Sequence, residues 1–196
     1  MIQSHKFILA SNSPRRKYLL NQIGLKFKIH PSKISENVLK NETPKENVLR
    51  LSLQKAIDVS KSYKDEIVIG ADTIVVLNDK ILGKPKSKND AVKMLNRLSN
   101  NSHFVYTGFA FVDSKTKKSF TGFEKTKVTF RKLTTDEIKL YVSSGSPMDK
   151  AGAYGIQDDF GAVFIKKING CYYNVVGLPL QNFFISLNKF INENGK

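Results

Sequence analysis

The chain has 196 residues, 40% of them hydrophobic and 25% charged, which suits one globular domain; no apolar run approaches the roughly 20 residues that span a bilayer. The single cysteine excludes an intramolecular disulfide and a thiolate metal cluster, and the three scattered histidines lack the spacing of a zinc site. The formal net charge of +15 attracts polyanions, but lysines spread over a chain rich in Asn and Ile are also typical of a biased genome composition, so charge alone does not predict specific nucleic-acid binding.

The first part of the chain is predicted to alternate strands and helices. In chain order we expect a strand over 6–11, a helix from Ser13, a strand over 25–30, a polar loop over 31–43 and a helix from Thr43 to about Tyr63. Ser13 is a good N-cap because Pro14 follows it at the first helical position. Thr43 and Glu46 form a capping box. Both helix starts are therefore predicted from local signals.

Residues 66–77, EIVIGADTIVVL, form an apolar stretch interrupted by the small residues and the acid of GAD. We expect a buried central strand with a break at this point. A carboxylate between two apolar runs needs a partner, so Asp72 is expected to project from the break toward a divalent metal, a lysine or a reacting water. The alternative is an aspartate that ends the strand by capping a turn.

The second part of the chain is predicted to be richer in hairpins. In chain order we expect a helix over 88–98, a strand over 103–113, a returning strand to about 131, a helix from Thr134 to Ser144, a hairpin of two strands within 161–177 and a helix over 178–192. The hairpin turns at Asn169-Gly170, which places Cys171 in a strand as a packing residue. Together the elements predict an α/β protein with a mixed, twisted sheet flanked by helices, in a single domain over 1–196.

Two arginines, Arg15 and Arg16, stand in the first turn of the first helix, where the helix dipole favours acids. The open N–H groups of a helix N-terminus and two guanidinium groups together suit phosphate oxygens. The hydroxyls of Ser11 and Ser13 add donors. This stretch therefore predicts an anion site, and the alternative is an exposed basic turn with ordinary surface arginines.

Other candidate residues are weaker when each is taken alone. Lys84 lies between a glycine and a proline, as a phosphate contact would require, while Lys55 in an amphipathic helix is more often a solvated lysine. In the glycine-rich loop over 149–157, Tyr154 can stack on a base and Gln157 can bind its edge, although such a loop can also be only a connection. The chain has no Walker loop and no dinucleotide fingerprint.

Taken together, these segments resemble the Maf family of nucleoside triphosphate pyrophosphatases. The matching segments follow the family's order and cover nearly the whole chain: LASNSPRR (9–16), the helix of Lys55, GADTIVV (70–76), LGKP (82–85), HFVYTG (103–108), SGSPMDKAGAYGIQ (144–157) and NVVGLPL (174–180). The resemblance implies an inosine-triphosphatase-like α/β fold with two lobes and a central cleft.

The resemblance also implies the reaction, which is metal-dependent hydrolysis of a nucleoside triphosphate to the monophosphate and pyrophosphate, with Mg²⁺ or Mn²⁺ as cofactor. Thr73 after Asp72 looks like the branch that acts on dTTP and UTP. The resemblance extends the expected substrates to modified pyrimidine nucleotides, and the expected role is the clearing of nucleotide pools. The alternatives are a 7-methyl-GTP or purine triphosphate pyrophosphatase, or a basic nucleic-acid-binding regulatory protein, which the family's link to arrest of cell division keeps open.

By resemblance, the site residues take distinct roles. Asp72 matches the proposed proton acceptor, and the positions of Arg15, Thr73 and Gln157 are linked to substrate choice. The remaining expected roles are charge neutralisation by Arg16, Lys55 and Lys84, the last two counted as catalytic, substrate contacts by Ser11, Ser13 and Tyr154, and metal ligation by Glu36 and Asp72.

The chain departs from the family's pattern twice. The family often has two adjacent acids where this chain has Ser35-Glu36, and this chain has an extra residue within Asp158-Asp159-Phe160. The second departure puts the edge of the base pocket, and with it the pyrimidine preference, in question.

The expected partners are the nucleotide substrate and a second copy of the chain, with no membrane and no specific nucleic acid. The family often dimerises, and the apolar last helix offers a surface for that, but a core role explains the same residues. The N-terminal residues lack a secretory pattern, so we expect a cytoplasmic protein.

Overall fold

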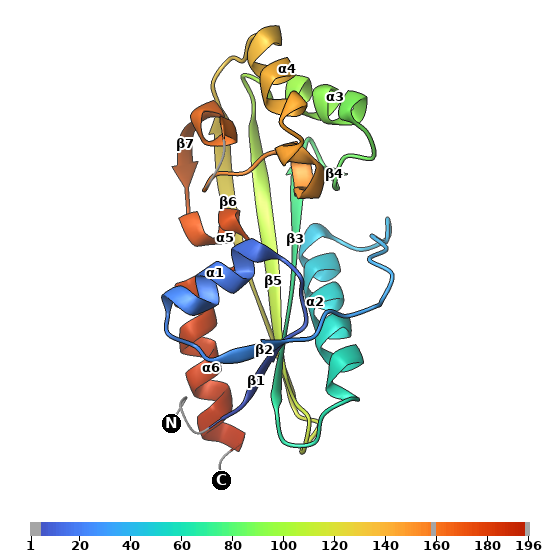
Figure 1. Ribbon diagram of the computed structural model, residues 1–196, viewed down its shortest axis with the longest axis vertical. Helices are drawn as coiled ribbons and strands as arrows, with labels where there is room; N and C mark the ends of the chain where they lie inside the picture. The colour runs from blue at the N-terminus through green and yellow to red at the C-terminus, as the bar shows by residue number, and fades with distance from the viewer. Residues whose placement is uncertain (1–4, 158–159, 195–196) are drawn as a thin grey trace. The chain divides into compact units, whose positions relative to one another are not determined.

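The computed structural model describes residues 5–157 and 160–194, which form two compact units (Figure 1). The first unit comprises Met1–Asp72, Thr107–Glu124 and Gly177–Lys196, and the second comprises Thr73–Tyr106 and Lys125–Val176. Three long strands contribute residues to both units: β3 (Ile67–Leu77), β5 (Ser102–Asp113) and β6 (Ser119–Phe130). The expected single domain over 1–196 stays a prediction, as does the cleft between two lobes.

The strands form a seven-stranded mixed sheet in the order β2-β1-β3-β5-β6-β7, with β4 paired to β3. The remaining strands are short: β1 (Phe7–Leu9), β2 (Phe27–Ile29), β4 (Lys80–Leu82) and β7 (Ile165–Asn169). β1 is parallel to β2 and to β3, whereas β4 is antiparallel to β3 and β7 is antiparallel to β6. The predicted α/β class with a mixed sheet is therefore confirmed.

In the first unit, three helices pack on the strands: α1 (Pro14–Gln22), α2 (Pro44–Ser60) and α6 (Leu180–Asn194). α2 shares one apolar cluster with the strands, and α6 contributes to a second, aromatic one. The first contains Ile8, Ala10, Ala56, Val59, Val68, Ala110 and Val112, and the second contains Phe109, Phe111, Phe120, Phe183 and Phe190. Burial of this apolar surface holds the unit together.

In the second unit, α3 (Lys88–Leu98) packs against α4 (Thr135–Ser143). Besides its strands, the described part of the unit also contains α5 (Tyr172–Val176), η2 (Ser146–Asp149), η3 (Ala151–Ala153) and η4 (Phe160–Phe164). One core joins these elements to the strands, through side chains that include Val75, Leu95, Leu98, Val128, Phe130, Tyr141 and Phe164.

The predicted helix starts are confirmed. Ser13 caps α1 by accepting from the Arg16 N–H, and Thr43 and Glu46 form the expected capping box of α2. Thr134 forms a second capping box at α4, which ends before Gly145 in the left-handed conformation, with φ of 78°. These signals act within a few residues, so the sequence reveals them directly.

The predicted break in the strand over 66–77 is wrong, because β3 runs without interruption through Gly70 and Asp72. Gly70 has a different purpose. A Cβ at this position would lie 2.1 Å from the Ser52 carbonyl oxygen of α2. The glycine therefore allows the helix to approach the strand closely, and this approach brings α2 to the segment that carries Asp72.

The predicted hairpin within 161–177 is also wrong. β7 pairs with β6, and the residues that follow form α5. The buried side chain of Asn174 ties this helix to the sheet, since its amide donates to the Val105 carbonyl and to the Thr126 hydroxyl. Cys171 lies between β7 and α5, where its backbone exchanges two hydrogen bonds with the same Thr126 hydroxyl. It is therefore not in a strand.

Among the described residues, no helix combines the length and the apolar character that crossing a membrane requires.

Candidate active site

The N-terminus of α1 carries a compact set of donors. The Ser11 hydroxyl accepts from the Ser13 N–H and from the Arg16 guanidinium, each at 3.2 Å. The Arg16 Nε also donates to the Gly177 carbonyl at 3.1 Å, so this side chain is buried and fixed at both ends of the guanidinium. Arg15 is half-buried in the same turn. The predicted cation pair at this helix end is therefore present, with Arg16 the more rigid of the two.

Arg16 lies in the field of nearby charges. Burial lowers the pKa of its guanidinium below the ordinary value, the carboxylates of Asp72 and Glu36 oppose that change, and the neighbouring charge of Arg15 reinforces it. The two acids therefore lie close enough to stabilise the buried cation. This relation links the start of α1 to the middle of β3 within the first unit.

Lys55 joins the two predicted acids. Its ammonium is 2.7 Å from Asp72 Oδ1 and 2.8 Å from Glu36 Oε1. Lys55 is 5% exposed and Asp72 is 6% exposed, while the Glu36 side chain is half exposed. The alternative of a solvated lysine is therefore wrong. The close packing of α2 on Gly70 places this side chain inside the unit, where a buried ammonium needs carboxylate partners.

The loop that carries Glu36 is fixed to α2 by two side chains that the sequence did not single out. The buried Asn47 accepts from the Leu39 N–H at 2.8 Å and donates to the Leu39 carbonyl. Arg50 donates to the Glu42 carboxylate and to the Asn37 carbonyl. The only signal in the sequence is that both are polar side chains on the helix that follows the loop, so only the structure reveals this function.

Two carboxylates that share one ammonium provide hard oxygen ligands of the kind that Mg²⁺ and Mn²⁺ prefer. Within the described ranges, no cluster of three or more His, Cys, Asp or Glu residues could hold a metal. Mg²⁺ is commonly bound through one or two carboxylates and substrate phosphates, without an all-protein cage. Glu36 and Asp72 therefore fit a metal that binds together with a phosphate substrate.

The other predicted residues belong to the second unit. Thr73 is half-buried on β3, directly after Asp72, and Lys84 is exposed. The loop of Lys84 is joined to the loop over 149–157 by a hydrogen bond from the Gly152 N–H to the Gly83 carbonyl, at 3.0 Å. The structure therefore connects the two loops that the sequence treated as separate signals.

Tyr154 does not have the predicted position. Its ring is 6% exposed and packs edge-on against Phe130, with ring centroids 4.8 Å apart. A ring enclosed in the core has no open face on which a base could stack, so the expected stacking role is wrong. Burial of this ring against the apolar side chains of β6 is more favourable than its exposure to solvent.

Gln157, three residues later, is half-buried. Its Oε1 atom is buried and has no hydrogen-bond partner within the described part of the chain. A buried acceptor without a partner costs about 1–3 kcal/mol, so a ligand that donates to it would gain. The departure at Asp158-Asp159 lies outside the described residues.

Known proteins are similar to this chain over most of its length. A model of the Maf family, described as Maf-like protein, matches residues 6–190. A protein of Dictyoglomus turgidum named dTTP/UTP pyrophosphatase is 46% identical over 94% of this chain and 96% of its own length. A Clostridium botulinum protein of the same name is 50% identical over 96% of each chain. Among solved structures, the Staphylococcus aureus Ham1 protein is similar, with a TM-score of 0.45 and 16% identity over 64% of this chain and 71% of its own. The family model and the curated relatives show that the chain belongs to the Maf family.

Proposed function

We propose that this protein hydrolyses dTTP and UTP to the nucleoside monophosphate and pyrophosphate. The names of the curated relatives support the substrates and the reaction. The observation that carries the proposal is Lys55, which lies between Asp72 and Glu36 inside the first unit, in the field that also acts on Arg16. A buried group of alternating charges of this kind is typical of a site that works on a charged substrate.

Phosphate binding is assigned to the cations of the site. Arg15 and Arg16 stand at the N-terminus of α1, where the helix dipole also favours an anion. The fixed guanidinium of Arg16 presents a rigid donor surface, and the Ser11 and Ser13 hydroxyls lie beside it. Lys84 is proposed as a further phosphate contact. In the free protein the positive end of the helix dipole and these cations repel one another. The negative charge of a bound triphosphate would offset that repulsion.

Catalysis is assigned to Asp72 as proton acceptor. In the proposed reaction, a water oxygen attacks the α-phosphorus and forms a new P–O bond. The bond between the α-phosphorus and the α–β bridging oxygen breaks. Pyrophosphate leaves with the electron pair of that bond, and the proton of the water passes to Asp72. Lys55 contacts the Asp72 carboxylate and orients it. Mg²⁺ or Mn²⁺, held by Glu36, Asp72 and phosphate oxygens, would supply charge neutralisation and a Lewis acid when bound.

Base preference is assigned to Gln157 and Thr73. The buried Oε1 of Gln157 can accept a hydrogen bond from the N3–H group that uracil and thymine share. Cytosine has an acceptor at N3, so that position offers no donor to the Gln157 Oε1, and CTP should be a poorer substrate. Guanine also carries a ring N–H, at N1, so the names of the relatives, and not this contact alone, favour pyrimidines over 7-methyl-GTP.

The wider role proposed for the chain is removal of unwanted nucleotides, including modified pyrimidine triphosphates, from the cytoplasmic pool. A link to arrest of cell division and a homodimer belong to the same proposal. These parts rest on the family alone.

The experiment is a substrate panel with the purified protein. It contains dTTP, UTP, CTP, GTP and 7-methyl-GTP, each with Mg²⁺, with Mn²⁺ or with chelator, and both pyrophosphate and phosphate are measured. The proposal expects pyrophosphate from dTTP and UTP, and no turnover with chelator. Release of phosphate alone, or turnover of none of the five, would refute it. Asp79→Asn, an exposed acid in the turn after β3, is the matched control for Asp72→Asn.

A further inference from the structure

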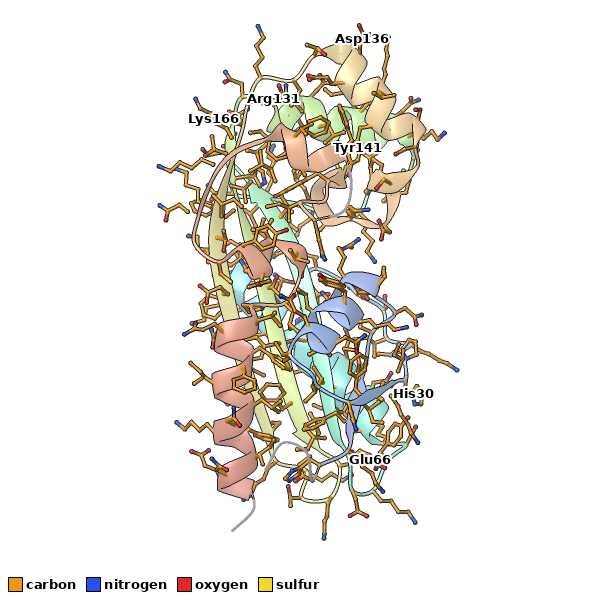
Figure 2. All side chains as sticks on the ribbon, turned by 60° about the vertical axis from the view of Figure 1, so that its left-hand side comes forward. His30, Glu66, Arg131, Asp136, Tyr141 and Lys166 are labelled. Atoms are coloured by element: carbon orange, nitrogen blue, oxygen red, sulfur yellow. The ribbon has the colours of Figure 1, made fainter. Side chains whose placement is uncertain are left out.

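The segment that leads to Gln157 is attached to the rest of the second unit by three hydrogen bonds. The Gly152 N–H donates to the Gly83 carbonyl. The Gly155 N–H donates at 3.2 Å to the hydroxyl of Tyr141, a residue of α4 that Figure 2 labels. Between them, the Tyr154 hydroxyl lies 2.7 Å from Nε2 of His103 on β5. The third contact is fully inside the core, and nothing in the proposed reaction uses it.

The ring of Phe130 packs edge-on against both members of the His103–Tyr154 pair. His103 is 1% exposed, and its ring packs edge-on against Tyr154 and Phe130, with centroids 5.2 and 5.1 Å apart. Burial lowers the pKa of His103 to about 4 and raises the pKa of Tyr154. Both groups are therefore neutral at pH 7. The bond between them forms in either neutral tautomer of the imidazole, with the phenol as donor or acceptor.

The backbone just before Tyr154 is strained. Gly152 has φ of 70° and Ala153, which is fully buried, has φ of 62°. A non-glycine residue in the left-handed region costs on the order of 1 kcal/mol and persists only where the surroundings hold it. A Cβ on Gly152 would lie 3.0 Å from the Val75 side chain, so the turn also packs tightly on β3. The strained turn aims Tyr154 into the core and carries the chain onward to Gln157.

We infer that His103 is a specificity-determining positioning residue: by holding Tyr154, it fixes the strained turn at Gly152-Ala153 and so sets where Gln157 presents its unpaired oxygen to the base. The inference rests on the proposed function, in which Gln157 binds the base. It assigns Tyr154 a new role in place of stacking. Tyr154 precedes Gln157 by three residues, and Gln157 is assigned to the base. The His103–Tyr154 bond therefore affects discrimination between bases and not the transfer of the proton to Asp72.

The decisive variant is Tyr154→Phe, which removes one hydroxyl and keeps the ring in its core position. We expect the ratio of kcat/KM for UTP over CTP to fall by about tenfold, the equivalent of one hydrogen bond, through a higher KM for UTP with kcat within about twofold. His103→Phe removes the other partner and should lower the ratio equally. The double variant should lower this ratio no further than either single variant does, because all three variants lose the same hydrogen bond.

The control is Val128→Ala, which opens space in the same core on β6 without touching the pair. It should lower the melting temperature and leave the UTP/CTP ratio unchanged. If Tyr154→Phe also leaves the ratio unchanged while lowering the melting temperature, the pair is only structural and the inference is wrong.

Failure of the proposed function gives a different result. If the wild-type chain binds nucleotides without hydrolysing them, the reaction is refuted, and the ratio of Kd values for UTP and CTP, measured by calorimetry, tests the inference in the same variants. A wild-type chain that neither binds nor hydrolyses UTP overturns both.

Discussion

Lys55→Met is the substitution whose effect the structure defines best. It removes an ammonium that is 5% exposed and lies 2.7 Å from Asp72, which is 6% exposed. Breaking a buried ion pair by deleting one partner costs about 3–5 kcal/mol, since the other charge is left buried. Glu36 adds little because its half-exposed side chain can turn to water. In a chain of this length, such a loss lowers the melting temperature by roughly 6–20 °C.

The assay is the free energy of unfolding from urea denaturation followed by circular dichroism. Lys61→Met, at the exposed C-cap of the same helix, is the matched control and should change stability by less than about 0.5 kcal/mol. The double variant Lys55→Met/Asp72→Asn should be more stable than the sum of the single losses predicts, because it removes the buried charge as well. A loss of less than about 0.5 kcal/mol in Lys55→Met would show that the buried Asp72 does not depend on this ammonium.

Three further predictions follow from the site and from the core of the second unit. Asp72→Asn should lower kcat by a factor on the order of 10²–10⁴, with the circular dichroism spectrum kept, while Asp79→Asn should not change kcat; equal activity of the two would remove Asp72 from the mechanism. Arg15→Ala should change the ranking of the nucleotides in the substrate panel, whereas Arg16→Ala should lower turnover of all of them and also stability, because Arg16 is buried; an unchanged ranking in the first variant would refute the division. His103 stays neutral in the folded chain down to about pH 4, but the unfolded chain binds its proton near pH 6.5. Stability from this group is therefore complete above pH 6.5 and falls by up to about 3 kcal/mol toward pH 4. The free energy of unfolding should consequently depend less on pH between 6.5 and 4 in His103→Phe than in the wild type, and equal slopes would contradict this.

Local signals explain the parts of the fold that the sequence predicts well. The caps at Ser13, Thr43 and Thr134 act through side chains that reach only three residues along the chain. Most of the strands follow from apolar runs of strand length. Such features need no information about distant residues, and the structure confirms them.

The errors arise where a distant contact decides the local structure. Gly70 looks like a strand break, but it allows the Ser52 carbonyl of α2 to come close. The Asn169-Gly170 pair looks like a hairpin turn, yet the residues after it form a helix whose Asn174 side chain bonds to β5 and β6. Propensity cannot show which residue of another element lies opposite.

The same reason limits what the sequence reveals of the site. The sequence offers the charged residues as candidates by their type, but the pairing of Lys55 with both Asp72 and Glu36 depends on how α2 lies on β3. The burial of Tyr154 depends on Phe130 and His103, which precede it by more than twenty residues. Residue types indicate the chemistry, whereas partners and burial come only from the fold.

The products formed from UTP decide whether this chain cleaves between the α- and β-phosphates. Purified protein is incubated with UTP and Mg²⁺, and uridine monophosphate, uridine diphosphate, phosphate and pyrophosphate are separated and measured. We expect equal amounts of uridine monophosphate and pyrophosphate, with formation of both lost in Asp72→Asn. Uridine diphosphate with phosphate, or undiminished turnover in Asp72→Asn, would contradict it.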